Sequence, residues 1–284
     1  GSTVKYGPYE QGYRDFLATM ATWYKDGLLD RNFATTDTKT LDANILNGLT
    51  GASAMYPGSG IGKYVPALKE KDPNAAMAPT AYPVLKKGDK PQFSSRINNY
   101  DGVSSVAISA TSKNAEAAAR WLDYGYSEEG NLLYNFGLEG QSYNMENGYP
   151  RMTDEVLNNP DKLPASQAWA KYARGNYSGP FVQKKEYIEQ YYVLQEQKDA
   201  LILWQDTDMA KHLIPPVSPT SDESAEFAKI MNDVKTLVDE YTLKIIMGNE
   251  SIDSFDNYIA QLKKSNIEKA IAIKQAAYDR FTKR

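Results

Sequence analysis

The chain opens with apolar and aromatic residues three and four positions apart, which is the period of a helix that buries one face. The run stops before Gly27, a residue that often ends helices. Its members are Tyr9, Tyr13, Phe16, Leu17, Met20, Trp23 and Tyr24. We predict an amphipathic helix over 9–24 with its aromatic stripe in the core. Leu41, Ile45, Leu46 and Leu49 predict a second helix.

Strand-like and helix-like patterns alternate in the middle of the chain. Small and branched residues predict strands at 52–56 and 103–110, and the two prolines within 78–85 predict an edge strand or an extended link there. Helices are predicted over 63–71, after a capping Asn114 with Ala118, Trp121 and Leu122 facing inward, and over 127–136. Residues 142–151 predict a loop or a hairpin. This alternation indicates an α/β fold in which helix exceeds strand.

The last third of the chain has a helical pattern throughout. Residues 154–211 predict polar helices with a loop at 174–180, and an apolar stripe runs from Phe227 to Tyr241. Two pairs have the spacing of a capping box, Thr220 with Glu223 and Ser265 with Glu268. Three helix-forming segments with short breaks are therefore expected to close the chain.

Composition excludes several classes of protein. The net charge of -4 argues against nucleic-acid binding, which needs a basic surface. Cysteine is absent, so no disulfide, thiol nucleophile or zinc–thiolate site can form. The one histidine, His212, lies in a polar stretch, and a metal site usually gathers several ligands. No apolar run reaches the roughly 20 residues that span a bilayer. We expect neither metal nor cofactor.

Aromatic residues with a polar edge are abundant, with 21 tyrosines and 4 tryptophans among 284 residues. Such rings suit sugars, which have apolar C–H faces and hydroxyl rims, although most of these tyrosines are expected to lie half-buried on helices. Planar polar side chains also recur beside aromatic rings near the predicted strands. The binding residues we predict from these two patterns are Arg96, Asn98, Tyr100, Asp101, Tyr143 and Trp204.

A glycine-rich turn follows the strand predicted at 52–56. Its sequence is Tyr56-Pro57-Gly58-Ser59-Gly60-Ile61-Gly62-Lys63. The spacing does not fit a phosphate loop, because position 57 is proline and Tyr64 stands where Ser or Thr would bind magnesium. A turn before a helix N-terminus still presents backbone N–H groups to a ligand. Tyr56 and Ser59 therefore join the predicted binding residues, with a plain tight turn as the alternative.

Two other functions remain open on the residues alone. A glycoside hydrolase would need two facing carboxylates, for which Asp101 and Glu139 are candidates, although most surface acids have no such role. A binder of peptides or of an anionic ligand could use the turn at Gly58.

Several segments, taken in order, resemble the family 1 extracellular solute-binding proteins of bacteria. They are Trp23 to Asp30, Ala52 to Tyr56, Val103 to Ser109, Ser112 to Ala118, and Trp121 to Gly130. The resemblance implies a helix-rich α/β fold of the periplasmic-binding-protein type II, with two lobes and a cleft. It implies that a carbohydrate, an oligosaccharide, is captured outside the cell and delivered to the membrane permease of an ABC importer, without catalysis.

The resemblance also implies an organisation for the chain. Residues 1–85 and 216–284 would form the C-terminal lobe, and 86–215 would return to the N-terminal lobe with a helical insertion. The lobe's opening segments and the family's lipidated N-terminal cysteine have no counterpart here, so we expect a C-terminal portion that acts as a monomer. Maltose-binding relatives carry a tryptophan at the turn matching 58–61, which this chain lacks. They also carry an aromatic residue shortly after the prolines matching Pro216 and Pro219, and its nearest counterpart here falls around Ala225. Maltose specificity is therefore not expected.

Overall fold

The computed structural model describes residues 2–94, 106–161, 163, 165–173 and 179–283. The chain divides into two compact units. Unit 1 comprises Gly1–Asp42 and Lys211–Arg284, and unit 2 comprises Ala43–Ala210. Helices α2 (Thr38–Leu46) and α10 (Met209–His212) cross the two points of division. Each unit is described separately below.

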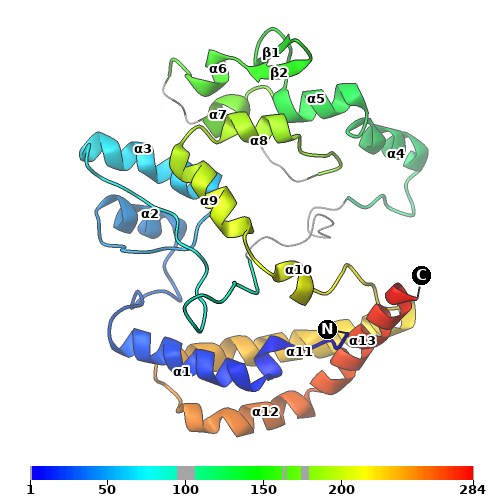
Figure 1. The fold of residues 1–284 in the computed structure, drawn as a ribbon. Coiled ribbons are helices and arrows are strands. Elements are labelled where there is room, and N and C mark those ends of the chain that lie inside the picture. The colour runs from blue at the N-terminus through cyan, green and yellow to red at the C-terminus, as the bar shows by residue number, and fades with distance from the viewer. Residues whose placement is uncertain (1, 95–105, 162, 164, 174–178, 284) are drawn as a thin grey trace. The chain divides into compact units, whose positions relative to one another are not determined.

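Unit 1 is made of helices, which appear in blue and in yellow to red in Figure 1. They are η1 (Gly7–Tyr9), α1 (Gln11–Lys25), α11 (Ser221–Ile246), η4 (Ile252–Ser254), α12 (Phe255–Lys264) and α13 (Ile267–Thr282). The predicted helix over 9–24 is confirmed as α1, and the predicted closing helices as α11, α12 and α13. The apolar stripe of α11 buries Ile230, Val234 and Val238, as its period requires.

The core of unit 1 combines aliphatic side chains with stacked tyrosines. The rings of Tyr241 and Tyr258 stack with centroids 4.2 Å apart, and Leu262 and Leu17 are fully buried beside this cluster. The buried hydroxyl of Tyr258 donates to the Pro8 carbonyl at 2.9 Å. Burial raises the pKa of Tyr258, so the hydroxyl stays protonated and keeps this bond.

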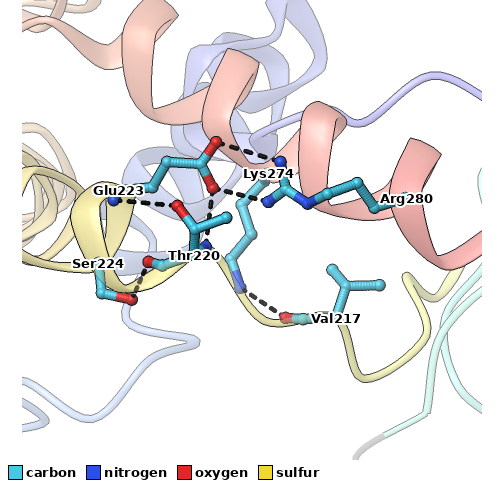
Figure 2. Close-up of polar contacts among 6 residues, drawn as sticks. All are labelled: Val217, Thr220, Glu223, Ser224, Lys274 and Arg280. Carbon is cyan, nitrogen blue, oxygen red and sulfur yellow. Dashed lines mark hydrogen bonds and ion pairs between the residues drawn. The ribbon is translucent and has the colours of Figure 1, made fainter.

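The ends of α11 and α13 are joined by polar contacts, drawn in Figure 2. Thr220 caps α11: its Oγ1 accepts from the Glu223 N–H at 3.3 Å, and a Glu223 carboxylate oxygen accepts from the Thr220 N–H at 2.8 Å. The predicted capping box is therefore confirmed. The same carboxylate accepts hydrogen bonds from both guanidinium Nη groups of Arg280, at 3.2 and 2.6 Å.

The second predicted capping box is wrong. Ser265 ends α12, and α13 begins after Asn266, which has a left-handed backbone with φ of 60°. Glu268 instead accepts a hydrogen bond from the Tyr9 hydroxyl at 2.8 Å. Ser265 and Glu268 have the spacing of a capping box. The connection between α12 and α13 is nevertheless too short to hold a separate cap residue with extended backbone.

Unit 2 contains shorter helices and a hairpin. Its helices are η2 (Pro57–Ile61), α3 (Gly62–Lys71), α4 (Ala115–Tyr124), α5 (Glu128–Phe136), α6 (Asp154–Leu157), α7 (Ala165–Trp169), α8 (Lys185–Tyr191) and α9 (Gln195–Gln205). The strands β1 (Tyr143–Glu146) and β2 (Tyr149–Met152) pair antiparallel, with Tyr143 opposite Met152. Asn147 and Gly148 connect them with φ of 52° and 81°, the backbone of a type I′ turn.

Two apolar clusters stabilise unit 2. One joins α5, the hairpin, α6, α7 and α8 through Phe136, Met152, Val156, Trp169 and Tyr187, among others. Its polar groups are paired: the Trp169 Nε1–H donates to the carbonyl of buried Asn135 at 3.0 Å. The other cluster lies between α3 and α9 and is built on Ile61, Val65 and Ala200.

The strand predicted at 52–56 is absent from the structure, as is any strand over 106–110, the described part of the prediction for 103–110. Residues 78–85 form no strand, which leaves the link as the alternative that stands there. The only strands among the described residues are β1 and β2. A strand needs a neighbour for its backbone N–H and C=O groups, and no strand among the described residues pairs with these segments.

Candidate functional site

The glycine-rich turn is the best-defined part of the predicted site. Tyr56 is extended, and Pro57–Ile61 then forms a π-helical turn that continues into α3. The Tyr56 carbonyl accepts from the N–H groups of Gly60 at 2.9 Å and Ile61 at 3.4 Å. The Pro57 carbonyl accepts from Nε2 of the buried Gln197 at 2.9 Å, which fixes the turn to α9.

The glycines in this turn are required by crowding. A Cβ on Gly60 would lie 2.5 Å from Cβ of Met55, and one on Gly62 would lie 2.6 Å from Nε2 of Gln197. A Cβ on Gly58 would lie 3.0 Å from Cε1 of Tyr191. None of the three has a positive φ. Close packing therefore holds the turn in place. Glycine at these positions lets Met55, Gln197 and Tyr191 approach the backbone of the turn.

Aromatic rings flank the turn. Tyr56 is 58% exposed, and Tyr191 and Tyr192 are half-buried beside Gly58. The rings of Tyr187 and Tyr191 stack with centroids 5.2 Å apart, and Tyr192 meets Tyr191 edge-on, also at 5.2 Å. This series of rings joins the core of unit 2 to the surface next to the turn. It gives a rigid apolar wall, with polar hydroxyl groups, that a flat ligand can contact.

Trp204 belongs to the same region. Its Nε1–H donates to the Thr80 carbonyl at 2.8 Å, and its ring packs on the cluster that contains Ile61. Met55, the neighbour of Tyr56, packs on that cluster too. The structure thus brings three predicted residues, Tyr56, Ser59 and Trp204, to one part of unit 2. Ser59 is exposed on the turn, whereas Trp204 is half-buried with its polar edge already paired.

Tyr143 lies in a different environment. Its ring is 5% exposed and packs on Phe136, with centroids 5.7 Å apart. Burial, followed by the charge of Glu139, raises the pKa of its hydroxyl. A hollow of about 390 Å³ is lined by Glu139, Tyr143 and three residues of α5, Glu128, Glu129 and Leu132. Tyr143 packs as a core residue does, and its role in binding stays a prediction.

Four predicted residues, Arg96, Asn98, Tyr100 and Asp101, lie outside the described residues. Their roles stay predictions, and so does the pairing of Asp101 with Glu139 across a substrate. Glu139 itself is exposed. Within the described ranges, no group of three or more His, Cys, Asp or Glu side chains is placed to hold a metal ion.

Tyr191 and Tyr192 were not among the residues predicted from the sequence. The available signal was the spacing of Tyr187 and Tyr191, which places both on one face of a helix and is followed directly by Tyr192. Their position beside Gly58 depends on how α8 packs on the turn, which no local pattern specifies.

Known proteins share parts of this sequence and this geometry. Residues 2–132 match the family model described as bacterial extracellular solute-binding protein. No match is found among curated proteins. No helix in the described part of the chain is both long and apolar enough to cross a bilayer.

Several solved structures share the fold. The alginate-binding protein AlgQ2, solved without calcium ion, is 25% identical, with a TM-score of 0.75 over 98% of this chain and 56% of that one. The S. pneumoniae ABC-transporter substrate-binding protein FusA, an EF-hand mutant in complex with fructo-nystose, is 15% identical, with a TM-score of 0.65 over 99% and 56%. A human-milk-oligosaccharide (HMO) binding, ABC-transporter-associated solute-binding protein from Bifidobacterium longum infantis is 15% identical, with a TM-score of 0.64 over 100% and 57%.

These likenesses show the fold of the chain. The fold is the helix-rich α/β fold of ABC-transporter substrate-binding proteins, as predicted. The match to the model of bacterial extracellular solute-binding proteins covers residues 2–132, and the solved structures share the fold over nearly the whole length of the chain. The chain spans a little over half the length of those structures, at 56% of AlgQ2.

Proposed function

We propose that this protein is part of the substrate-binding component of an ABC importer and captures an oligosaccharide outside the cell. The observation that carries the proposal is the tightly packed glycine turn of a solute-binding fold, flanked by the exposed Tyr56 and by Tyr191 and Tyr192. The similar structures include an alginate-binding protein and complexes with fructo-nystose and kestose, which supports a carbohydrate ligand.

The turn and its rings would act by reversible contact. A tyrosine face covers the apolar C–H face of a sugar ring, while hydroxyl groups and the backbone N–H groups at the start of η2 pair with its hydroxyls. Arg96, Asn98, Tyr100 and Asp101 would add planar polar groups, and Trp204 and Ser59 would complete the wall near the turn. No bond of the sugar is broken in this scheme, so the protein is a binder and not an enzyme.

The remaining features of the proposal concern the whole protein. The lobes would be 1–85 with 216–284, and 86–215, with the sugar between them. The loaded protein would dock as a monomer on the membrane permease, and an N-terminal lipid would anchor the full-length protein to the cell surface. The extracellular, solute-binding character of the family supports this location.

A thermal-shift screen tests the ligand class. A compound that binds only the folded state raises the melting temperature. We expect a shift with alginate or fructan oligosaccharides, or with milk oligosaccharides, and none with peptides or phosphorylated compounds. A shift with a peptide or phosphorylated compound alone would contradict the proposal. Cleavage of an oligosaccharide by the purified protein would favour the hydrolase alternative.

Replacement of Tyr56 tests the site. Tyr56→Ala should weaken binding of the sugar found in the screen by about fivefold in calorimetry, because losing one aromatic contact costs about 1 kcal/mol. Tyr126→Ala is a matched control, since Tyr126 is also 58% exposed but lies between α4 and α5. Equal affinities for the two variants would remove Tyr56 from the site. Tyr100→Ala, made in the full-length protein, should also weaken binding, and unchanged affinity would exclude Tyr100.

A further inference from the structure

The hollow beside Tyr143 gathers negative charge from two elements of unit 2. Glu128 and Glu129 lie in the first turn of α5, Leu132 follows one turn later, and Glu139 lies in the loop between α5 and β1, both green in Figure 1. Among the described residues, no cationic side chain lines the hollow or pairs with these three carboxylates. A concave surface lined by charge of one sign concentrates ions of the other sign.

The hydroxyl of Tyr143 provides a second, independent sign of a ligand. The residue is only 5% exposed, yet its hydroxyl forms no hydrogen bond with a described residue. Buried tyrosine hydroxyls usually have a partner, as that of Tyr258 has in the Pro8 carbonyl and that of Tyr241 in Ser254 Oγ. No side-chain polar atom in the described part of the chain is both fully buried and unpaired. The Tyr143 hydroxyl therefore opens into the hollow that this residue lines.

The groups around the hollow are held in place without a ligand. The Glu139 carboxylate is near enough to the Tyr143 hydroxyl for its charge to act on it, but no hydrogen bond joins the two. Oγ of the buried Ser142 fixes the loop that carries Glu139, because it accepts from the Leu138 N–H at 2.8 Å and donates to the Phe136 carbonyl at 2.6 Å. A ligand between the carboxylate and the hydroxyl would thus meet a prearranged pair of acceptors.

The arrangement favours an organic cation over a metal ion. Across the described ranges, no three acidic or histidine side chains are close enough to surround one metal ion. An ammonium group carries three donors and no acceptor, so it pairs with carboxylates and with a phenol oxygen, and the methylene groups beside it can cover an apolar side chain.

We propose that this hollow, the α5 hollow, binds a small organic cation with two primary ammonium groups. One ammonium would lie between Glu139 and the Tyr143 hydroxyl, the methylene groups would cover Leu132, and the other ammonium would face Glu128 and Glu129. The volume of about 390 Å³ is in the range of small-molecule pockets. The α5 hollow is distinct from the turn at Gly58 and does not rest on the proposed function.

Calorimetry with 1,4-diaminobutane, on the purified chain at low ionic strength and pH 7, tests the charge of the hollow. Glu139→Gln should weaken binding by about fivefold, the upper end of what an exposed ion pair contributes. Glu70→Gln is the matched control, because Glu70 is exposed on α3, does not line the hollow and loses the same charge. Its affinity should stay close to that of the wild type, since charges far apart in water are screened.

Two further measurements test the hydroxyl and the two-ended arrangement. Tyr143→Phe keeps the ring that packs on Phe136 and removes only the oxygen, so it should weaken binding by about threefold without lowering the melting temperature. The single ammonium of 1-aminobutane should bind about fivefold more weakly than the diamine. Equal affinities for the two amines would overturn the two-ended arrangement.

The other outcomes also decide between sources of the cation. Equal affinities of Glu139→Gln and Glu70→Gln, or no binding of the diamine, would overturn the proposal. Tighter binding of calcium ion would assign the hollow to a metal, and tighter binding of a lysine peptide would assign it to a protein partner. If Glu139→Gln lowers the melting temperature, Glu128→Gln replaces it with the same expectations. No sugar enters these measurements, so the proposed function can fail while this inference stands.

Discussion

At the scale of single residues, the clearest electrostatic feature is Glu223. Arg280, first, and then the Thr220 N–H hold the pKa of its carboxyl at about 2, against an ordinary value of 4.5. The shift comes from hydrogen bonds that favour the charged form. The residue stands in the first turn of α11, where negative charge also suits the helix dipole (Figure 2).

This shift makes a prediction for stability against pH. Because the folded pKa lies below the unfolded value, Glu223 stabilises the fold above pH 4.5, and this contribution is lost as pH falls from 4.5 to about 2. Glu223→Gln should therefore lower the melting temperature at pH 7 and flatten its decline between pH 4.5 and 2. Asp222→Asn, in the same turn but not a partner of Arg280, is the control. Identical pH profiles for the two variants would contradict this explanation.

At the scale of elements, the hairpin depends on its two-residue turn. Asn147 and Gly148 both have positive φ, and nothing lies within 4 Å of a Cβ built on Gly148. An added methyl group at Gly148 would thus meet backbone strain and no clash. Gly12, within α1, also has open space around it but has ordinary helical backbone.

These two glycines predict opposite effects of the same substitution. Gly148→Ala should lower the free energy of unfolding by about 1 kcal/mol, the cost of left-handed backbone for alanine. Gly12→Ala should raise it by about 0.5–1 kcal/mol, because alanine favours helix over glycine. Urea denaturation, monitored by circular dichroism, measures both. A loss of stability in both variants would show that space, and not backbone conformation, decides the outcome.

At the scale of the whole molecule, the apolar clusters are separate. One lies within unit 1 and two lie within unit 2, so each unit has a core of its own among the described residues. Leu262 of unit 1 and Phe136 of unit 2 are fully buried in their respective clusters. The stability of each unit should therefore depend mainly on its own core.

Hydrogen exchange tests this independence. Leu262→Ala should reduce amide protection by about 2–5 kcal/mol in α1, α11, α12 and α13, because a buried leucine leaves a cavity. Phe136→Ala should reduce protection by a similar amount in α5 and the hairpin. Each variant should leave the other unit within about 0.5 kcal/mol of the wild type, as expected for independent sites. Uniform loss across both units would show one cooperative body instead.

Local patterns in the sequence were enough to predict most helices, including the helices that close the chain in unit 1. Periodic apolar residues and the Thr220–Glu223 box report interactions within a few residues of each other, so they predicted α1 and α11 correctly. Composition also excluded thiol chemistry and favoured aromatic contacts. Periodicity and capping are local properties, and composition is a sum over the chain. Neither depends on which distant segments are in contact.

Strand pairing, burial and the position of Tyr191 depend on contacts between segments that are distant in the sequence. Strand formation at 52–56 depends on a neighbour that can be far away in sequence, and here no strand among the described residues pairs with it. The prediction that Trp121 faces inward is wrong, because that side chain is 66% exposed, and Tyr191 reached Gly58 only through the packing of α8 on the turn. Burial and pairing are relations between distant segments, so a local pattern can indicate the need for a partner but cannot supply one.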